Sequence, residues 1–338
     1  MRLSILDQSV ACTGRDEGHA LRDTLALAEH GEALGYHRFW VSEHHGMPTI
    51  VGSAPEVLMA AIAARTQRIR IGSAGVMLPH YAALKVAEQC RVLDALAPGR
   101  IDLGVGRAPG SDGRTALALN PNAVHLARTA DHFPEQVQDL QAWTRGQRHQ
   151  GLWARPLPPA GTPLAQLPEL WMLGSSDYGA RLAAQLGLPY AFAYFFMDGE
   201  GAEAALALYH QLYQPSERHP RPHATLCVWA LAADSAEEAA HHALSRERWR
   251  LDRQRGLLGA LRPPDSIAAE GYTAEEWPLV QATRRKAFVG TGAQVAAQLQ
   301  ALAEQFGLAE LVVNTWAHDP AVRRRSYALL AQALGVSA

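Results

Sequence analysis

The feature that most constrains the fold is a regular alternation of strand-like and helix-like segments, which starts at the first residues. Short runs rich in Ile, Val and Leu are each followed by a stretch with apolar residues at helical spacing. The first strands are expected at residues 2–8, 36–42, 68–77 and 101–105, and helices at 18–34, 54–66 and 81–96. A helix after every strand gives parallel neighbouring strands and right-handed crossovers.

The alternation continues, with interruptions, to the end of the chain. Further strands are expected at residues 170–173, 190–196, 225–232 and 311–315, and further helices at 129–143, after 176 to 186, 200–213, 236–249, 292–306 and 320–334. This pattern predicts an α/β fold, a (β/α)8 TIM barrel. No linker divides the chain, so we expect one domain over residues 1–338, with insertions near 108–128, 144–168 and 250–290.

Composition narrows the classes of partner. The 31 basic and 33 acidic residues give a net charge of -2, so nucleic acid and acidic membranes are not expected partners. Cys12, Cys90 and Cys227 are too far apart for a disulfide framework or a metal motif. The start of the chain is unlike a signal sequence, and no apolar run reaches the roughly 18 residues that span a bilayer. We therefore expect a cytoplasmic protein.

Candidate functional residues follow from the barrel, because barrel active sites lie at the carboxyl ends of the strands. The second strand ends in Glu43, His44 and His45, and the fifth in Gly174, Ser175 and Ser176. The third, fourth and eighth strands end in residues 73–77, 104–107 and 314–316.

The end of the fifth strand is a candidate anion site. Ser175 or Ser176 could cap the following helix, whose free N–H groups and dipole favour a negative charge. Arg107, at the neighbouring strand end, would add a fixed positive charge. Together they suggest a phosphate site. The alternative is an ordinary helix cap, with the Asp177 carboxylate occupying the same field.

The histidines and glycines at strand ends allow fewer conclusions. His44 and His45 have no third ligand at a useful spacing, so no metal site is predicted. A single imidazole acting as acid or base, or as a donor to a bound anion, is favoured over a metal ligand, and a structural role remains the alternative. The glycines of residues 104–106 lack the spacing and the following helix of a dinucleotide-binding motif.

Two further regions carry open alternatives. The arginine-rich segment 250–290 is either a solvated charged face or a mobile lid. Tyr194 and Phe196 are expected to alternate on the sixth strand, where they either pack in the core or line a pocket.

Taken together, the strand ends resemble those of the bacterial luciferase-like flavin monooxygenases, over nearly the whole chain and most closely in the single-chain subgroup. The matching stretches are residues 39–45 (Phe-Trp-Val-Ser-Glu-His-His), 71–79, 99–107, 171–176 with Ala180 and 187–189, and 288–291. No single stretch is specific, but the combination is.

The resemblance implies a flavin site at the mouth of the barrel. The cofactor would be reduced FMN, supplied by a separate NAD(P)H:flavin reductase, whereas a smaller branch of the family uses F420. His44 corresponds to the catalytic histidine of the family. Residues 74–75 correspond to a bulge behind the flavin ring that often holds a cis non-prolyl peptide. The implied cofactor contacts are Ala74, Gly75, Met77, Arg107, Gly174, Ser175, Ser176 and Tyr178.

The implied activity is monooxygenation of a small organic substrate with reduced FMN and O2. The alternatives are an F420-dependent dehydrogenase or reductase that transfers hydride, and a non-catalytic flavin-binding protein. The reactive thiol of luciferase proper has no counterpart at the end of the fourth strand, so light emission is not implied. A homodimer is expected by analogy, formed through the helices at 54–66 and 81–96.

Overall fold

The structure, a computed structural model, describes residues 1–108, 111–121 and 132–337. Its centre is a barrel of parallel strands: β1 (Arg2–Asp7), β2 (Arg38–Val41), β3 (Arg70–Met77), β4 (Ile101–Gly106), β5 (Glu169–Gly174), β6 (Tyr190–Phe192), β7 (Ala224–Ala233) and β9 (Glu310–Asn314). Each strand pairs with two neighbours, and the β6–β7 and β1–β9 pairings close the ring. The predicted TIM barrel is confirmed.

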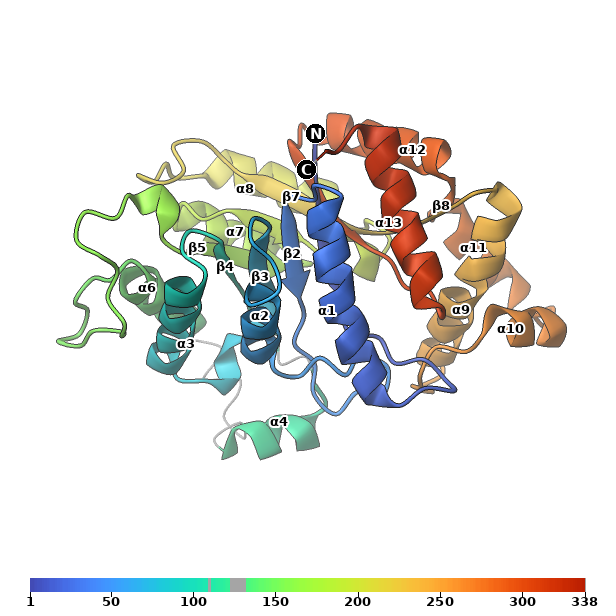
Figure 1. Ribbon diagram of the computed structural model, residues 1–338, viewed down its shortest axis with the longest axis horizontal. Coiled ribbons are helices and arrows are strands. Elements are labelled where there is room, and N and C mark those ends of the chain that lie inside the picture. Colours follow the sequence, from blue (N-terminus) through green and yellow to red (C-terminus); the bar gives the residue numbers. More distant parts are fainter. Residues whose placement is uncertain (109–110, 122–131, 338) are drawn as a thin grey trace.

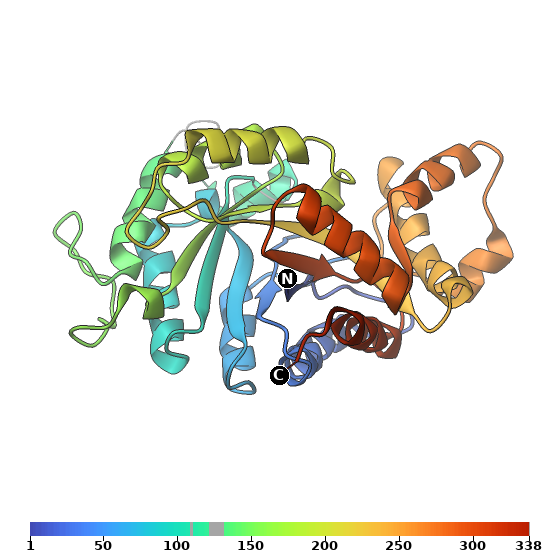
Figure 2. The ribbon, with the colours of Figure 1, turned by 90° about the horizontal axis from the view of Figure 1, so that it is seen from above.

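Helices surround this barrel: α1 (Glu17–Ala33), α2 (Pro55–Ala63), α3 (Ala83–Leu96), α6 (Phe133–Thr144), α7 (Asp177–Gln185), α8 (Ala202–Leu212), α12 (Gly292–Gln305) and α13 (Pro320–Leu334). The helices α9 (Ala236–Gln254), α10 (Pro264–Glu270) and α11 (Trp277–Arg285) form a lobe on the side opposite α3 and α6 (Figures 1 and 2). Within the described residues, every helix is too short or too polar to cross a membrane.

Two elements are additional to the sequence expectation, and one expected boundary is not described. The insertion after β4 contains a helix, α4 (Gly113–Leu119), which begins where the Asp112 side chain accepts a hydrogen bond from the Thr115 N–H at 2.8 Å. The start of the helix expected from residue 129 lies outside the described residues. The additional strand β8 (Phe288–Thr291) pairs with Ala230–Ala233, because β7 is long enough to extend past the barrel.

The prediction for the sixth strand was wrong at its carboxyl end. β6 stops at Phe192, and Tyr194–Phe196 form the 3-10 turn η4. The Ala193 N–H still reaches the Gly174 carbonyl of β5, but its own carbonyl accepts the Phe196 N–H and so turns the chain. Tyr194 and Phe196 therefore do not alternate on a strand.

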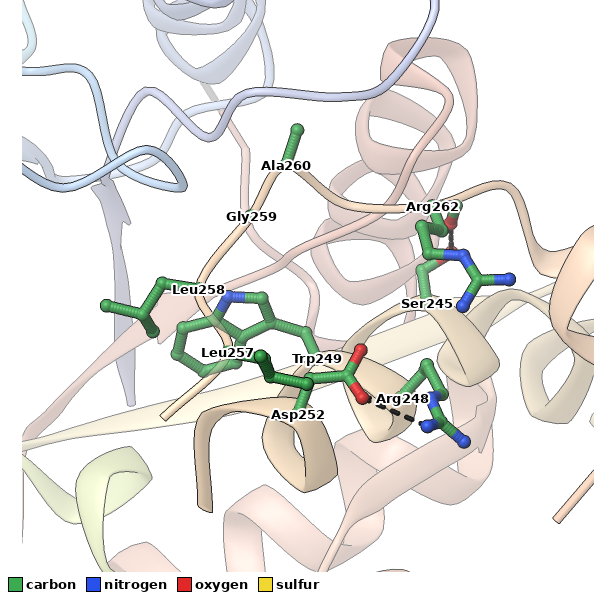
Figure 3. A pocket seen from close by; sticks show the side chains of 9 residues that line it. All are labelled: Ser245, Arg248, Trp249, Asp252, Leu257, Leu258, Gly259, Ala260 and Arg262. Carbon is green, nitrogen blue, oxygen red and sulfur yellow. Dashed lines mark hydrogen bonds and ion pairs between the residues drawn. The ribbon is translucent and has the colours of Figure 1, made fainter. Parts of the chain in front are cut away.

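The segment 250–290 is structured and tied to α9 by ion pairs. Arg248 pairs with Glu276 at 3.1 Å, and Arg284 pairs with Glu247 at 2.9 Å. Figure 3 shows Leu257 and Leu258 beside the indole of Trp249, where all three line a cleft of about 130 Å³. These ion pairs join the segment to α9, so it is more than a solvated face. Its action as a lid stays a prediction.

The barrel interior is filled in layers. The middle layer is apolar and consists of Leu6, Trp40, Trp171, Ala191, Cys227 and Val312. Trp40 and Trp171 meet edge to face, with ring centroids 5.1 Å apart. Gly72 makes room for this packing, because a Cβ at that position would lie 2.6 Å from the Trp40 ring. This apolar layer separates the two ends of the barrel.

Candidate active site

The loop after β2 is organised by Glu43, which is 2% exposed. Its Oε2 accepts the Met77 N–H at 3.0 Å, and its Oε1 accepts the Tyr81 hydroxyl at 2.6 Å. The His45 Nε2 lies 2.7 Å from the same Oε1. Glu43 therefore joins the end of β2 to the end of β3. Sequence reasoning quoted Glu43 within its motif but gave it no role.

His44, the next residue, is free of such partners. Its N–H donates to the Gly52 carbonyl at 3.0 Å, which fixes the backbone. The ring Nδ1 is buried and has no hydrogen-bond partner among the described residues. Burial, with smaller contributions from the nearby His45 and Arg253, lowers the pKa of His44 from 6.5 to about 4. The imidazole is thus neutral near pH 7, with an unused ring nitrogen.

The end of β3 carries the bulge that the resemblance implies. The pairing of β3 with β4 shifts register between Ser73 and Val76, and the Ala74–Gly75 peptide is cis, as expected. The Ser73 hydroxyl donates to the Gly104 carbonyl at 2.9 Å. A Cβ on Gly75 would lie 2.3 Å from the Leu173 side chain and 2.9 Å from the Gly104 carbonyl oxygen. The close approach of these two strand ends therefore requires glycine at position 75.

The ends of β4 and β5 bring the candidate anion-binding residues together. The Arg107 guanidinium lies 3.7 Å from the centroid of the Tyr178 ring, in the first turn of α7. Ser176 is the N-cap residue of α7, as predicted, but within the described chain its side chain makes no capping hydrogen bond. Ser175 and Ser176 are both exposed. Their hydroxyls, the first N–H groups of α7 and Arg107 therefore all remain available to an anion.

The carboxyl end of the barrel also carries an aromatic cluster, of which sequence reasoning named only Trp316, as part of a strand end, and gave it no role. Trp229 at the end of the barrel part of β7, Trp316 after β9 and Trp249 on α9 belong to one cluster with Val10 and Ile50. Trp249 and Trp316 meet edge to face with centroids 4.7 Å apart. Trp249 lies in a charge-rich helix, where its pattern gave no sign that it faces the barrel mouth.

One group of metal-type ligands occurs among the described residues. Glu169, His219 and His223 offer ligand atoms within 4.8 Å of one another, but they lie at the amino ends of β5 and β7. They are therefore at the opposite end of the barrel from His44. Sequence reasoning did not consider this group, and His44 and His45 do not belong to it.

The predicted site residues thus fall into two sets at one end of the barrel. His44, Ala74, Gly75 and Met77 lie at the ends of β2 and β3, where Glu43 connects the two strands. Arg107, Gly174, Ser175, Ser176 and Tyr178 lie at the ends of β4 and β5. The pairing of β3 with β4 joins the two sets through Met77 and Gly106. Their roles toward a cofactor stay predictions.

Sequence relatives cover the whole chain. It is 40% identical to the uncharacterized protein YwcH of Bacillus subtilis, over 98% of each chain. It is 38% identical to the luciferase-like monooxygenase of Escherichia coli K12, over 96% of this chain and 95% of that protein. The crystal structure of apo-MsnO8 superimposes with a TM-score of 0.88 at 34% identity, covering 99% of both chains.

Two more distant solved structures share the fold alone. The oxygenating constituent of 3,6-diketocamphane monooxygenase from Pseudomonas putida, in complex with FMN, has a TM-score of 0.70 at 18% identity. An F420-dependent secondary alcohol dehydrogenase, with an F420–acetone adduct, has a TM-score of 0.68 at 13% identity. The family model of the luciferase-like monooxygenases matches residues 1–310 of this chain. The protein therefore belongs to the luciferase-like monooxygenase family and is an oxidoreductase.

Proposed function

We propose that the protein is an FMN-dependent monooxygenase, which uses reduced FMN and O2 to oxygenate a small organic substrate. The observation that carries this proposal is the arrangement at the ends of β4 and β5. There Arg107 stacks on Tyr178 beside the uncapped start of α7, at the same end of the barrel as the unpartnered nitrogen of His44. A separate flavin reductase would supply the reduced cofactor.

The residues present fit a phosphorylated flavin. Arg107, Ser175, Ser176 and the first N–H groups of α7 would hold the phosphate, because each is a donor and together they are positive. Ala74, Gly75 and Met77 would lie along the ring system, where the glycine backbone permits close approach. Gly174 and Tyr178 would complete the site between these two parts.

When bound, reduced FMN would supply the electrons for oxygen activation, and this chain's residues would control protons and water around it. The neutral His44 would accept or donate a proton at its free ring nitrogen. Glu43 would act as a positioning residue, because it fixes the backbone of Met77 and the hydroxyl of Tyr81. The aromatic cluster of Trp229, Trp249 and Trp316 would exclude water.

Cofactor binding to wild-type protein and to Arg107→Met tests this function. We expect the wild type to bind FMN more tightly than F420, and Arg107→Met to bind FMN about tenfold or more weakly, the scale of a lost charged hydrogen bond. Preferential binding of F420 would instead support a hydride-transferring dehydrogenase. With a flavin reductase, NADH and isotopically labelled O2, a monooxygenase places one labelled oxygen atom in its product.

We also propose a homodimer formed through α2 and α3. Their outer surface exposes Val57, Val92 and Leu96, whose exposed fractions are 63%, 48% and 65%. Large apolar side chains exposed on neighbouring helices favour a protein interface there. Sedimentation of Val57→Glu should show dissociation toward monomer, whereas Glu203→Gln on the exposed side of α8 should leave the mass unchanged.

A further inference from the structure

Three residues with metal-type ligand atoms meet at the amino end of the barrel, away from the candidate active site. Glu169 begins β5, His219 lies in the loop between α8 and β7, and His223 directly precedes β7. Each residue offers one ligand atom, and the three atoms all lie within 4.8 Å of one another. The helices α7 and α8 and the strand β6 separate Glu169 from both histidines along the chain, so the tertiary structure brings the group together.

Both histidines of this group present a ring nitrogen without a partner. The Nε2 atoms of His219 and His223 are buried and accept or donate no hydrogen bond within the described residues. Burial is the first cause that lowers the pKa of both rings, to about 4 for His219. Both imidazoles are therefore neutral near pH 7, and the tautomer with its proton on Nδ1 leaves a lone pair on Nε2. A neutral imidazole is the form that binds a metal ion.

The Glu169 carboxylate has one oxygen that is held and one that faces His219. Its Oε2 accepts hydrogen bonds from Arg38 at 2.7 Å and from the indole N–H of Trp171 at 2.8 Å. Its Oε1 lies 3.4 Å from the His219 Nε2 and 3.7 Å from the Arg218 Nε, which are longer contacts. Burial raises the pKa of Glu169, but Arg38 and further arginines hold it well below its usual range. Oε1 is thus the charged oxygen nearest to the two imidazoles.

Contacts outside the group hold its members in place. The Tyr213 hydroxyl donates to the His219 carbonyl at 2.8 Å, and the Tyr209 hydroxyl donates to the His223 carbonyl at 3.2 Å. The His223 ring also meets the ring of Trp171 edge to face, with centroids 4.9 Å apart. Outer contacts of this kind orient the ligands in metal sites. The backbone of each histidine and the plane of the His223 ring are therefore fixed before any ion binds.

We propose that Glu169, His219 and His223 bind a divalent transition-metal ion, with zinc as the expected ion. Two imidazole nitrogens and one carboxylate oxygen form a set of ligands that zinc accepts. Because the ligand atoms lie within 4.8 Å of one another, each needs to move by less than about 1 Å to reach the roughly 2.1 Å of a zinc bond. Water would take the fourth position from the open cleft that Arg218, His219 and residues 220–222 line.

The charges and ligand types around the site select the class of ion. Arg38 and Arg218 lie beside the Glu169 carboxylate and oppose a further positive charge. Asp102 and Glu310 offset part of this opposition, because both form ion pairs with Arg38. Magnesium and calcium require several oxygen ligands, of which the group supplies one, whereas imidazole suits zinc, copper and nickel. A transition metal is therefore favoured, and the arginines lower its affinity.

Metal titration of the full-length, tag-free protein without flavin tests the proposal. The protein is dialysed against a chelator, and Zn²⁺, Co²⁺ or Mg²⁺ is then added while heat and visible absorption are recorded. We expect one Zn²⁺ per chain, Co²⁺ absorption bands that disappear when Zn²⁺ is added, and no binding of Mg²⁺. Saturating Zn²⁺ should also raise the Tm, because an ion that binds the folded chain stabilises it.

Substitution of the ligands locates the ion. His219→Gln and His223→Gln should each weaken Zn²⁺ binding by at least about tenfold, the scale at which even the outer contacts of a metal site act. Both variants should also lose the rise in Tm. The matched control is His210→Gln, because His210 is an exposed histidine on the neighbouring helix α8. This control should keep the affinity and the Tm shift of the wild type.

Three outcomes would overturn the assignment. The first is a wild type in which neither Zn²⁺ nor Co²⁺ binds. The second is an affinity for Zn²⁺ that both His219→Gln and His223→Gln leave unchanged, which would place the ion elsewhere. The third is an equal loss of binding in His210→Gln, which would show that histidines at the surface bind the ion without a defined site. Because no step uses flavin, these results are independent of the proposed monooxygenase activity.

Discussion

The two ends of the barrel differ in how their buried charged groups are paired. At the amino end, Arg38 is 3% exposed and forms ion pairs with Asp102 at 2.8 Å, Glu169 at 2.7 Å and Glu310 at 3.0 Å. Other donors also bind these carboxylates. For example, Asp102 accepts a hydrogen bond from the indole N–H of Trp40 at 3.0 Å. Here each buried charge lies beside an opposite charge, and donors contact both oxygens of each carboxylate.

At the carboxyl end, Glu43 and the Asp7–Arg323 ion pair are also satisfied, but two buried ring nitrogens are not. The Nδ1 of His44 and the Nε1 of Trp229 have no hydrogen-bond partner within the described structure, and the charges near His44 are His45 and Arg253, which are basic. Native proteins satisfy nearly all buried polar groups, so each unpartnered group needs an explanation, and we propose that a ligand supplies the missing partner at the mouth. The ion-pair network at the amino end maintains the fold.

The amino end contains one exception, which sharpens the contrast. The Nε2 atoms of His219 and His223 are buried without a hydrogen bond to any described residue. However, the His219 Nε2 lies 3.4 Å from a carboxylate oxygen of Glu169. His44 at the mouth has no described carboxylate within ion-pair distance. Unsatisfied histidines thus occur at both ends, but only His219 has a described carboxylate nearby, in addition to basic groups.

Removing Arg38 should produce the largest effect on stability. Arg38→Met leaves the buried carboxylates of Asp102, Glu169 and Glu310 without their shared cation, and breaking a buried ion pair on one side costs about 3–5 kcal/mol. We expect the urea midpoint to fall accordingly, with little change in the slope of the transition. Arg325→Met, which breaks the exposed pair with Asp234, should change it little. Equal changes in the two variants would refute the idea that the amino end stabilises the fold.

Removing His44, in contrast, should affect turnover rather than stability. His44→Ala should reduce turnover by roughly 100-fold, the scale of lost acid–base catalysis, while FMN affinity stays within about tenfold. The matched control is His37→Ala, because burial also lowers the pKa of His37 to about 4 but His37 lies at the amino end, beside Arg2. The control should keep its turnover. Unchanged turnover in His44→Ala would remove this residue from the mechanism.

The sequence predicted the fold and the amino-acid types at the strand ends, because both follow from local periodicity. Each barrel strand was expected within a few residues of its position, since the alternation of β-branched runs and helical stretches is strong. The structure departs from the expected elements where pairing between segments distant in sequence determines the local conformation. β8 forms only because β7 extends past the barrel, and the turn at Tyr194 depends on where β5 stops supporting β6.

The candidate site was only partly predictable for a related reason. His44 and Arg107 follow directly from strand ends, whose place in a barrel is known before the structure. Arg246 and Trp249 lie instead in the run 245–250, whose charge density is typical of a solvated helix. Nothing local indicates that one arginine in that run is buried on Trp229, because this depends on packing between segments distant in sequence.

The smallest expected effect concerns pH, and it compares the two ends directly. Burial lowers the pKa of His44 and of His219 to about 4. Each stays neutral in the folded protein while the unfolded chain binds a proton below its ordinary pKa of about 6.5, so stability falls as pH drops from about 6.5 toward 4. Each such histidine contributes a slope of up to about 1.4 kcal/mol per pH unit.

Urea unfolding between about pH 7.5 and about pH 5, above the range where carboxylates titrate, isolates these histidines. His44→Gln should flatten the profile, because the charges facing His44 are only His45 and Arg253, which both oppose protonation. His219→Gln should flatten it by a similar amount, because burial, together with His223, Arg218 and Arg145 and against Glu169, lowers the pKa of His219 to about 4 as well. A flat wild-type profile, or a profile that neither substitution flattens, would show that burial does not lower the pKa of the histidines at the two ends of the barrel.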